Sequence, residues 1–327
     1  MSTQEICINF LTDIKYNDLK FDIEKFYETQ ILNHSFTHPS GLTLTAVELP
    51  GSLKKPALVI IPGRGEIAHK YAEFLYSLKD SNIRVVILFA RAQGGSTRLL
   101  ADEERCHIDD FANFRQDIDF LIKKLKIEKY NLMAFSLGCL ISLDLILNSN
   151  VKPQKAALLA PYIYPFYPLP KFILGALIRI LGALPISNIA YTPHGGKYKR
   201  IAFEENNHSH SKIRYNAYHD YYADHKNLTI GGPTWGFLRQ TYIAQQKLLK
   251  GNFEFPIPIR VLCAGDDKVV DTKVAFEFFK KHSKDKYAPK VSIIKNAYHD
   301  LLIEADEYRL QSLNYAIKFL FEDNMLD

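Results

Sequence analysis

Short apolar runs alternate with amphipathic stretches along the first half of the chain. The runs are rich in β-branched residues and end at turn residues, a pattern that predicts buried strands. We expect strands at residues 42–48, 57–61, 83–89, 130–133 and 156–160. Apolar residues at helical spacing predict helices at residues 68–79, 109–125 and 140–147. Alternating strands and helices predict an α/β fold with a mostly parallel sheet and helices on both faces.

The alternation stops at residue 161 and returns at residue 256. An apolar run at residues 172–184 is typical of a helix, but Arg179 interrupts it and it is too short for a membrane span. Strand patterns return near residues 259 and 291, and a helix is expected at residues 301–321.

These changes of pattern predict two parts. Residues 1–160 and 256–327 are expected to form the α/β core, with an N-terminal arm of partly helical character at residues 1–40. Residues 161–255 are expected to form a helical cap. The apolar run in the cap leaves two roles open, which are packing on the core and contact with an acyl chain or a membrane.

Charge and cysteine usage narrow the classes of partner. The 327 residues carry a formal net charge of +5 without a basic stripe, which argues against nucleic acid as a partner and is compatible with an anionic membrane surface. The four cysteines (Cys7, Cys106, Cys139 and Cys263) show no paired spacing, and the histidines crowded at residues 208–225 match no ligand pattern. We therefore expect free thiols and no metal. The first residues lack a secretory signal, which predicts a cytoplasmic protein, with contact to the inner face of the membrane left open.

A candidate nucleophile follows the strand expected at residues 130–133. Residues 134–138 read Ala-Phe-Ser-Leu-Gly, and an apolar helix pattern comes next. This is the layout of a nucleophile elbow, G-x-S-x-G, with Ala134 in place of the first glycine. The arrangement predicts Ser136 as the nucleophile and the Leu137 N–H as one oxyanion donor.

Later segments supply an acid and a base in the order that α/β-hydrolases use. Asp266 and Asp267 follow one expected strand, and His299 follows the next. The residues alone leave the choice between the two aspartates open. His69 is a competing base, but it falls early in the chain and on an expected helix. Asp109 is expected in a loop or at the N-cap of the helix at residues 109–125.

The loop after the strand at residues 57–61 supplies the rest of an oxyanion hole. It reads Pro-Gly-Arg-Gly-Glu over residues 62–66. We expect the Arg64 N–H to be the second donor, because Gly63 and Gly65 let the backbone approach the substrate. Gly63 is thus also a candidate substrate contact.

Taken together, these pieces resemble the bacterial lysophospholipases in the monoacylglycerol-lipase-like branch of the α/β-hydrolases. The likeness covers roughly residues 35–320. The matching segments are residues 62–64, 70–73, 91–96, 134–138, 160–161, 231–235 and 267–271, with His299. The resemblance implies an α/β-hydrolase fold and a triad of Ser136, Asp267 and His299, with Asp267 favoured because the family pattern places the acid directly before a basic residue and two valines. It also implies that no cofactor is needed.

The resemblance predicts a serine ester hydrolase for lysophospholipids or similar monoacyl lipids. Trp235 lies in the block at residues 231–235, where it either lines the acyl path or packs the cap. Alternatives on the same fold are a carboxylesterase, a monoacylglycerol lipase, an acyltransferase and a proline-type aminopeptidase. A catalytically idle lipid-binding protein is a further alternative, and the sequence leaves monomer and homodimer equally open.

Overall fold

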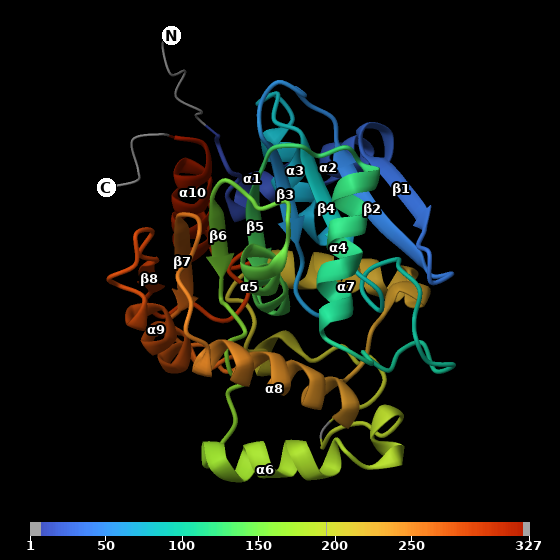
Figure 1. Cartoon of the computed structure of the whole chain (residues 1–327). Coiled ribbons are helices and arrows are strands. Elements are labelled where there is room, and N and C mark those ends of the chain that lie inside the picture. The colour runs from blue at the N-terminus through green and yellow to red at the C-terminus, as the bar shows by residue number, and fades with distance from the viewer. Residues whose placement is uncertain (1–7, 194, 323–327) are drawn as a thin grey trace.

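The structure, a computed structural model, describes residues 8–193 and 195–322, and it places an eight-stranded sheet at the centre (Figure 1). The strand order is β1-β2-β4-β3-β5-β6-β7-β8, with β1 and β2 antiparallel to their neighbours and the others parallel. The strands are β1 (Leu32–Thr37), β2 (Thr43–Leu49), β3 (Ala57–Ile61), β4 (Val85–Phe89), β5 (Tyr130–Phe135), β6 (Ala156–Leu159), β7 (Ile259–Ala264) and β8 (Lys290–Ile294). The predicted mostly parallel sheet is confirmed.

Helices cover both faces of the sheet because the central strands are apolar on both sides. In β3, Val59 and Ile61 belong to the core beneath one face, whereas Leu58 and Ile60 belong to the core beneath the other. The first core takes side chains from α4 (Ala112–Lys124), α5 (Leu137–Asn148) and α9 (Thr272–Lys281). The second takes side chains from α3 (Ala72–Leu78) and α10 (Asp306–Phe321). A short 3₁₀ helix, η1 (Ala68–Tyr71), leads into α3.

The N-terminal arm contains more than the expected helices. Helices α1 (Asp13–Asp18) and α2 (Lys20–Gln30) do form, but the arm then continues as the edge strand β1. This strand was not predicted, because residues 32–37 are largely polar and none of them is buried. Main-chain pairing with β2 therefore holds β1 in place, and no apolar pattern predicts it.

The expected N-cap role of Asp109 is wrong. Helix α4 begins at Ala112 with Phe111 in the N-cap position. The Asp109 carboxylate contacts the His107 ring at 2.9 Å, and it is Asp110 that accepts the Ala112 N–H. Asp109 lies in the loop, which was the other role expected for it.

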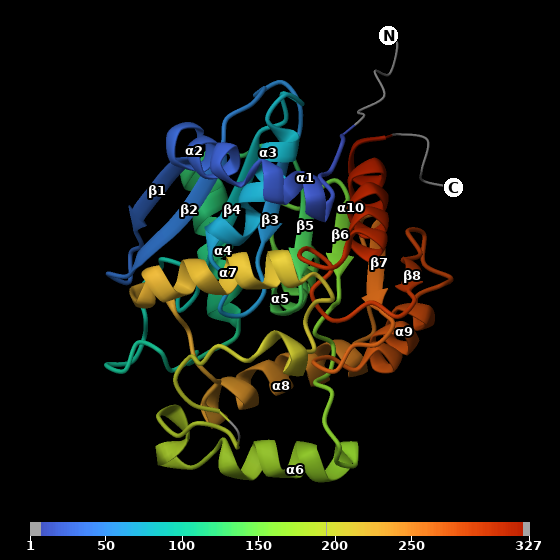
Figure 2. The same ribbon diagram turned by 180° about the vertical axis from the view of Figure 1, so that it is seen from behind.

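Residues 161–255, called the insertion below, separate β6 from β7. They contain α6 (Lys171–Leu181), α7 (Lys212–Asp224) and α8 (Trp235–Lys250), with the short 3₁₀ helices η2 (Pro185–Asn188), η3 (Phe203–Glu205) and η4 (Lys226–Leu228). Figures 1 and 2 show α6 as the helix farthest from the sheet, with α8 between α6 and the core. Helix α7 contacts α1 and η1. Within residues 8–193 and 195–322, no helix is long and apolar enough to cross a membrane.

Candidate active site

Ser136 lies on a strained turn between β5 and α5. Its φ of 51° and ψ of −116° fall outside the regions that ordinary residues favour, as expected for a nucleophile elbow. Gly138 allows the tight turn, because a Cβ at that position would lie only 2.1 Å from the Ile61 carbonyl oxygen. The elbow is therefore packed directly against the end of β3.

His299 and Asp267 extend from Ser136 in a hydrogen-bonded series. The His299 Nε2 lies 3.0 Å from the Ser136 Oγ, and its Nδ1 lies 2.7 Å from an Asp267 carboxylate oxygen. The other Asp267 oxygen accepts the N–H groups of Val269 and Val270 at 2.8 and 2.9 Å. All three side chains are buried, so their mutual geometry is fixed by the surrounding core.

The two competing residues lie elsewhere. Asp266 is half-exposed and pairs with Lys268 rather than with His299. The His69 ring lies 2.7 Å from Glu24 and stacks on Tyr221. The structure thus brings Ser136, Asp267 and His299 together and leaves these two residues out.

The loop that carries Arg64 is held by neighbours on several sides. The Gly63 N–H donates to Glu66 at 2.7 Å, and the Gly65 N–H donates to the Gln93 side chain at 2.9 Å. Tyr222 donates its hydroxyl proton to the Gly65 carbonyl. In the described ranges, by contrast, neither the Arg64 nor the Leu137 N–H has an internal hydrogen-bond partner. Both amides are therefore available for an external oxygen.

A pocket of about 260 Å³ opens over Ser136 and His299. Much of its wall is aromatic, supplied by Phe135, Tyr198, Tyr215, Tyr218 and Tyr222. His208 also lines it, with its ring 5.8 Å from that of His299. Burial, helped by the nearby His299, lowers the pKa of His208 to about 3, so its imidazole is neutral near pH 7.

The two carboxylates among the pocket-lining residues share one buried ammonium. Lys70 donates to Glu66 and, at 2.5 Å, to Asp300, while its own side chain is only 1% exposed. This cluster was not predicted from the sequence. A signal was present in the i,i+4 spacing of Glu66 and Lys70, but Asp300 comes from the other end of the chain.

Two predicted substrate contacts lie outside the wall of this pocket. Gly63 packs on Phe135, and a Cβ there would lie 2.8 Å from that ring. Trp235 packs against the small apolar cluster that joins α6 to α8 and that includes Ile178 and Tyr242. Of the two roles left open for Trp235, this position supports packing.

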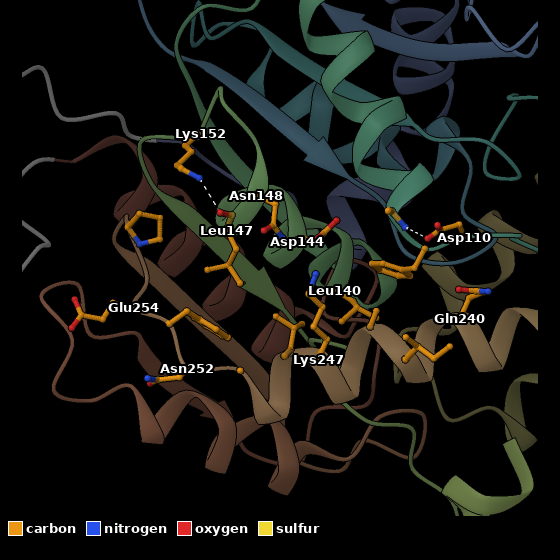
Figure 3. Close-up of a pocket in the computed structure, with 18 residues that line it drawn as sticks. Asp110, Leu140, Asp144, Leu147, Asn148, Lys152, Gln240, Lys247, Asn252 and Glu254 are labelled. Carbon is orange, nitrogen blue, oxygen red and sulfur yellow. Dashed lines mark hydrogen bonds between the residues drawn. The ribbon is translucent and has the colours of Figure 1, made fainter. Parts of the chain in front are cut away.

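A larger cleft of about 530 Å³ lies between α5 and α8 (Figure 3). Leu140 and Leu147 line it from α5, and Gln240 and Lys247 line it from α8. It shares no lining residue with the pocket over Ser136, so it is separate from the candidate active site.

The cysteines and histidines form no metal site in the part of the chain that the structure describes. Cys106, Cys139 and Cys263 are free and buried, and Cys7 lies outside the described residues. Several insertion histidines have separate partners instead, such as Glu304 for His210 and Tyr198 for His219.

Comparison with known proteins identifies relatives across most of the chain. Residues 53–306 match the family model described as "Serine aminopeptidase, S33". Lysophospholipase L2 of Escherichia coli K12 is 28% identical over 296 residues, which cover 88% of this chain and 87% of the relative. Probable lysophospholipase L2 of Haemophilus influenzae is 26% identical, covering 83% of this chain and 85% of the relative.

The fold also has solved counterparts. The crystal structure of a monoacylglycerol lipase from Paleococcus ferrophilus superposes with a TM-score of 0.67, covering 85% of this chain and 98% of that chain. Its sequence identity is 16%, so this likeness concerns the fold alone. The fold is the α/β-hydrolase fold, as the resemblance implied.

Proposed function

Because the chain belongs to the serine aminopeptidase S33 family, we propose that it is a serine hydrolase that cleaves the carboxylic ester of monoacyl lipids, most specifically of lysophospholipids. The observation that carries the proposal is the buried Asp267–His299–Ser136 series beside two unpaired backbone amides. The relatives named lysophospholipase L2 support the choice of substrate.

The geometry suits a two-step acyl transfer. The Ser136 Oγ attacks the ester carbonyl carbon while His299 Nε2 takes the hydroxyl proton, and the Arg64 and Leu137 N–H groups bind the oxyanion. His299 then gives its proton to the departing glycerol-side alcohol, which leaves an acyl-enzyme. Water, deprotonated by His299, releases the fatty acid and restores Ser136. Asp267 fixes the imidazole orientation and stabilises its cation throughout. This chemistry needs no cofactor.

The charges in the pocket favour an ester over a peptide substrate. An aminopeptidase needs a carboxylate to hold the substrate amine, whereas both carboxylates that line this pocket are paired with Lys70. Glu204, an acid of the insertion, pairs with Lys212 outside the pocket. Neither carboxylate of the pocket wall is therefore free to pair with the ammonium group of a peptide substrate.

A panel of substrates tests this choice. Fatty-acid release from lysophosphatidylcholine, lysophosphatidylethanolamine and monoacylglycerol is compared with release of arylamine from proline amides. We expect kcat/KM to be highest for a lysophospholipid and turnover of proline amides to be negligible. Preferred cleavage of proline amides would replace this function with that of an aminopeptidase.

We further propose that residues 161–255 form a cap whose outer helix contacts a membrane surface. Residues 166–189 expose many large apolar side chains to solvent, including Phe172 (78% exposed) and Ile180 (64%). Lys171 and Arg179 flank them with positive charge. Such a surface suits the interface at which lysophospholipids reside.

Sedimentation with vesicles of phosphatidylethanolamine and phosphatidylglycerol tests this contact. The double variant Phe172→Ser with Ile180→Ser should bind at least about tenfold more weakly, because each side chain loses about 1.5–3 kcal/mol of burial. Phe21→Ser is the matched control, since Phe21 is 79% exposed on α2, away from α6. Equal binding of the double variant and wild type would contradict the membrane contact.

A further inference from the structure

Lys70 places one buried ammonium at the junction of three segments of the candidate active site. Its Nζ donates to Glu66 and Asp300 and lies 4.5 Å from the centroid of the Phe135 ring. Lys70 itself belongs to η1, which carries none of the residues assigned to the reaction. A side chain that reaches all three segments from outside can fix their relative positions.

Each of the three contacts leads to a different reacting group. Glu66 holds the Gly63 N–H at 2.7 Å, directly before the proposed oxyanion donor Arg64. Asp300 directly follows His299 in the chain. Phe135 directly precedes Ser136, and its ring centroid lies 5.0 Å from that of His299. Ser136 and His299 are thus each adjacent in sequence to a residue that contacts Lys70. Arg64 is adjacent to Gly63, which Glu66, a partner of Lys70, holds.

The cluster is charged and closely satisfied. Burial raises the pKa of Glu66, whereas Lys70, the Gly63 N–H and the Tyr71 hydroxyl all donate to its side chain and so favour the carboxylate. Burial disfavours the ammonium, but Asp300 and Glu66 more than offset this and raise the pKa of Lys70. Removing one charge of such a cluster leaves the others unpaired in the core.

We propose that Lys70 is a positioning residue for the ester hydrolysis, and that its ammonium, through Glu66 and Asp300, sets the oxyanion loop and the His299 loop in place around Ser136. The inference rests on the function proposed above. Its effect falls on kcat rather than on KM, because Lys70 touches no substrate and acts on the alignment of reacting groups. Misplacement of such groups by about 1 Å costs up to about 100-fold in rate.

Neutral variants separate this role from a contribution to stability. Lys70→Met alone buries two unpaired carboxylates and should lose both stability and activity. The triple variant Lys70→Met, Glu66→Gln and Asp300→Asn keeps the shapes without charge, and replacing a buried ion cluster in this way can be nearly neutral for folding. We expect the triple variant to regain most of the melting temperature lost by Lys70→Met. Its kcat for p-nitrophenyl butyrate should stay about 10- to 100-fold below wild type, with KM within about threefold.

Asp300→Asn provides a second variant that retains a balanced Lys70–Glu66 pair. It should fold and lower kcat about tenfold. The matched control is Arg84→Met with Glu48→Gln. It neutralises a buried pair between Glu48 of β2 and Arg84, the residue directly before β4, whose Nε lies 2.7 Å from Glu48. This control should keep the wild-type kcat.

The outcomes distinguish the two proposals. If the triple variant or Asp300→Asn folds and keeps the wild-type kcat, the positioning role is wrong while the hydrolase function stands. If wild type neither cleaves the ester nor reacts with a labelled fluorophosphonate at Ser136, the function fails and the positioning role fails with it.

Discussion

Two helices of the insertion, α6 and α7, differ in how they are attached to the rest of the protein. Helix α6 buries Leu174 and Ile178 against Tyr164 and Tyr242, and much of its remaining apolar surface is exposed. Helix α7 is anchored to the core by a buried arginine and lines the pocket over Ser136. The insertion thus combines an apolar outer helix with a polar and aromatic inner one.

The anchor of α7 shows how this division is maintained. The Arg214 guanidinium contacts Glu73 of α3 at 2.8 Å, Asp306 of α10 at 3.0 Å and Asp13 of α1 at 2.6 Å. These ion pairs tie the pocket wall to the N-terminal arm and to the core. Among the residues that the structure describes, α6 has no comparable buried ion pair. We infer that the pocket wall is rigid and that the outer surface is free to adapt to a partner.

Breaking the α7 anchor should have the largest effect. Arg214→Met removes the guanidinium that Glu73, Asp306 and Asp13 share, and it leaves Arg309, 3.1 Å from Glu73, as that carboxylate's remaining buried counter-charge. We expect the free energy of unfolding to fall by about 3 kcal/mol, the lower end for a broken buried ion pair. Urea-induced unfolding followed by circular dichroism measures this loss. Lys212→Met, in the exposed pair on the same helix, is the control and should leave the unfolding midpoint unchanged. A small effect of Arg214→Met would show that α7 is held by its aromatic packing instead.

Acid should weaken the α7 side of the insertion by a smaller amount. The folded state lowers the pKa of His208 from 6.5 to about 3, mainly by burial. Its contribution to stability is therefore complete above pH 6.5 and declines as the pH falls from 6.5 towards 3. Between pH 7 and pH 5 this decline is about 2 kcal/mol. Urea unfolding measures this loss in wild type and in His208→Asn. Between pH 7 and pH 5 the free energy of unfolding should fall by about 2 kcal/mol less in the variant than in wild type. Equal losses in both proteins would contradict the burial of a neutral imidazole.

Changes to the exposed side of α6 should have the smallest effect on stability. Phe172→Ser combined with Ile180→Ser should alter the free energy of unfolding by no more than about 0.5 kcal/mol, because both side chains already face solvent. The same double variant is the one expected to lose vesicle binding. A stability loss of several kcal/mol would mean that this surface is packed against another part of the protein in solution.

The central strands and the positions of the candidate triad could be predicted because their signals are local. Strand β3 was expected at the residues where it forms, since it is a continuous apolar run. Ser136 and His299 each follow such a strand, so their positions follow from the pattern around them. Asp267 was separated from Asp266 by the family resemblance rather than by local chemistry.

Features that depend on distant residues could not be predicted. Strand β1 is polar and is defined by its pairing with β2. Lys70 meets Asp300 across 230 residues of sequence, and Arg214 of the insertion meets Asp13 of the N-terminal arm. Such partners have no mutual spacing to recognise, and only the folded sheet brings them together.

The Ser136→Ala variant gives the most direct test that Ser136 is the nucleophile of a monoacyl-lipid hydrolase. Fatty acid released from a lysophospholipid is measured for wild type and variant at matched concentrations, with thermal unfolding as the check on folding. We predict active wild type and a loss in the variant of at least about 1,000-fold in kcat, with an unchanged melting temperature. A folded Ser136→Ala protein that releases fatty acid at the wild-type rate would contradict the assignment.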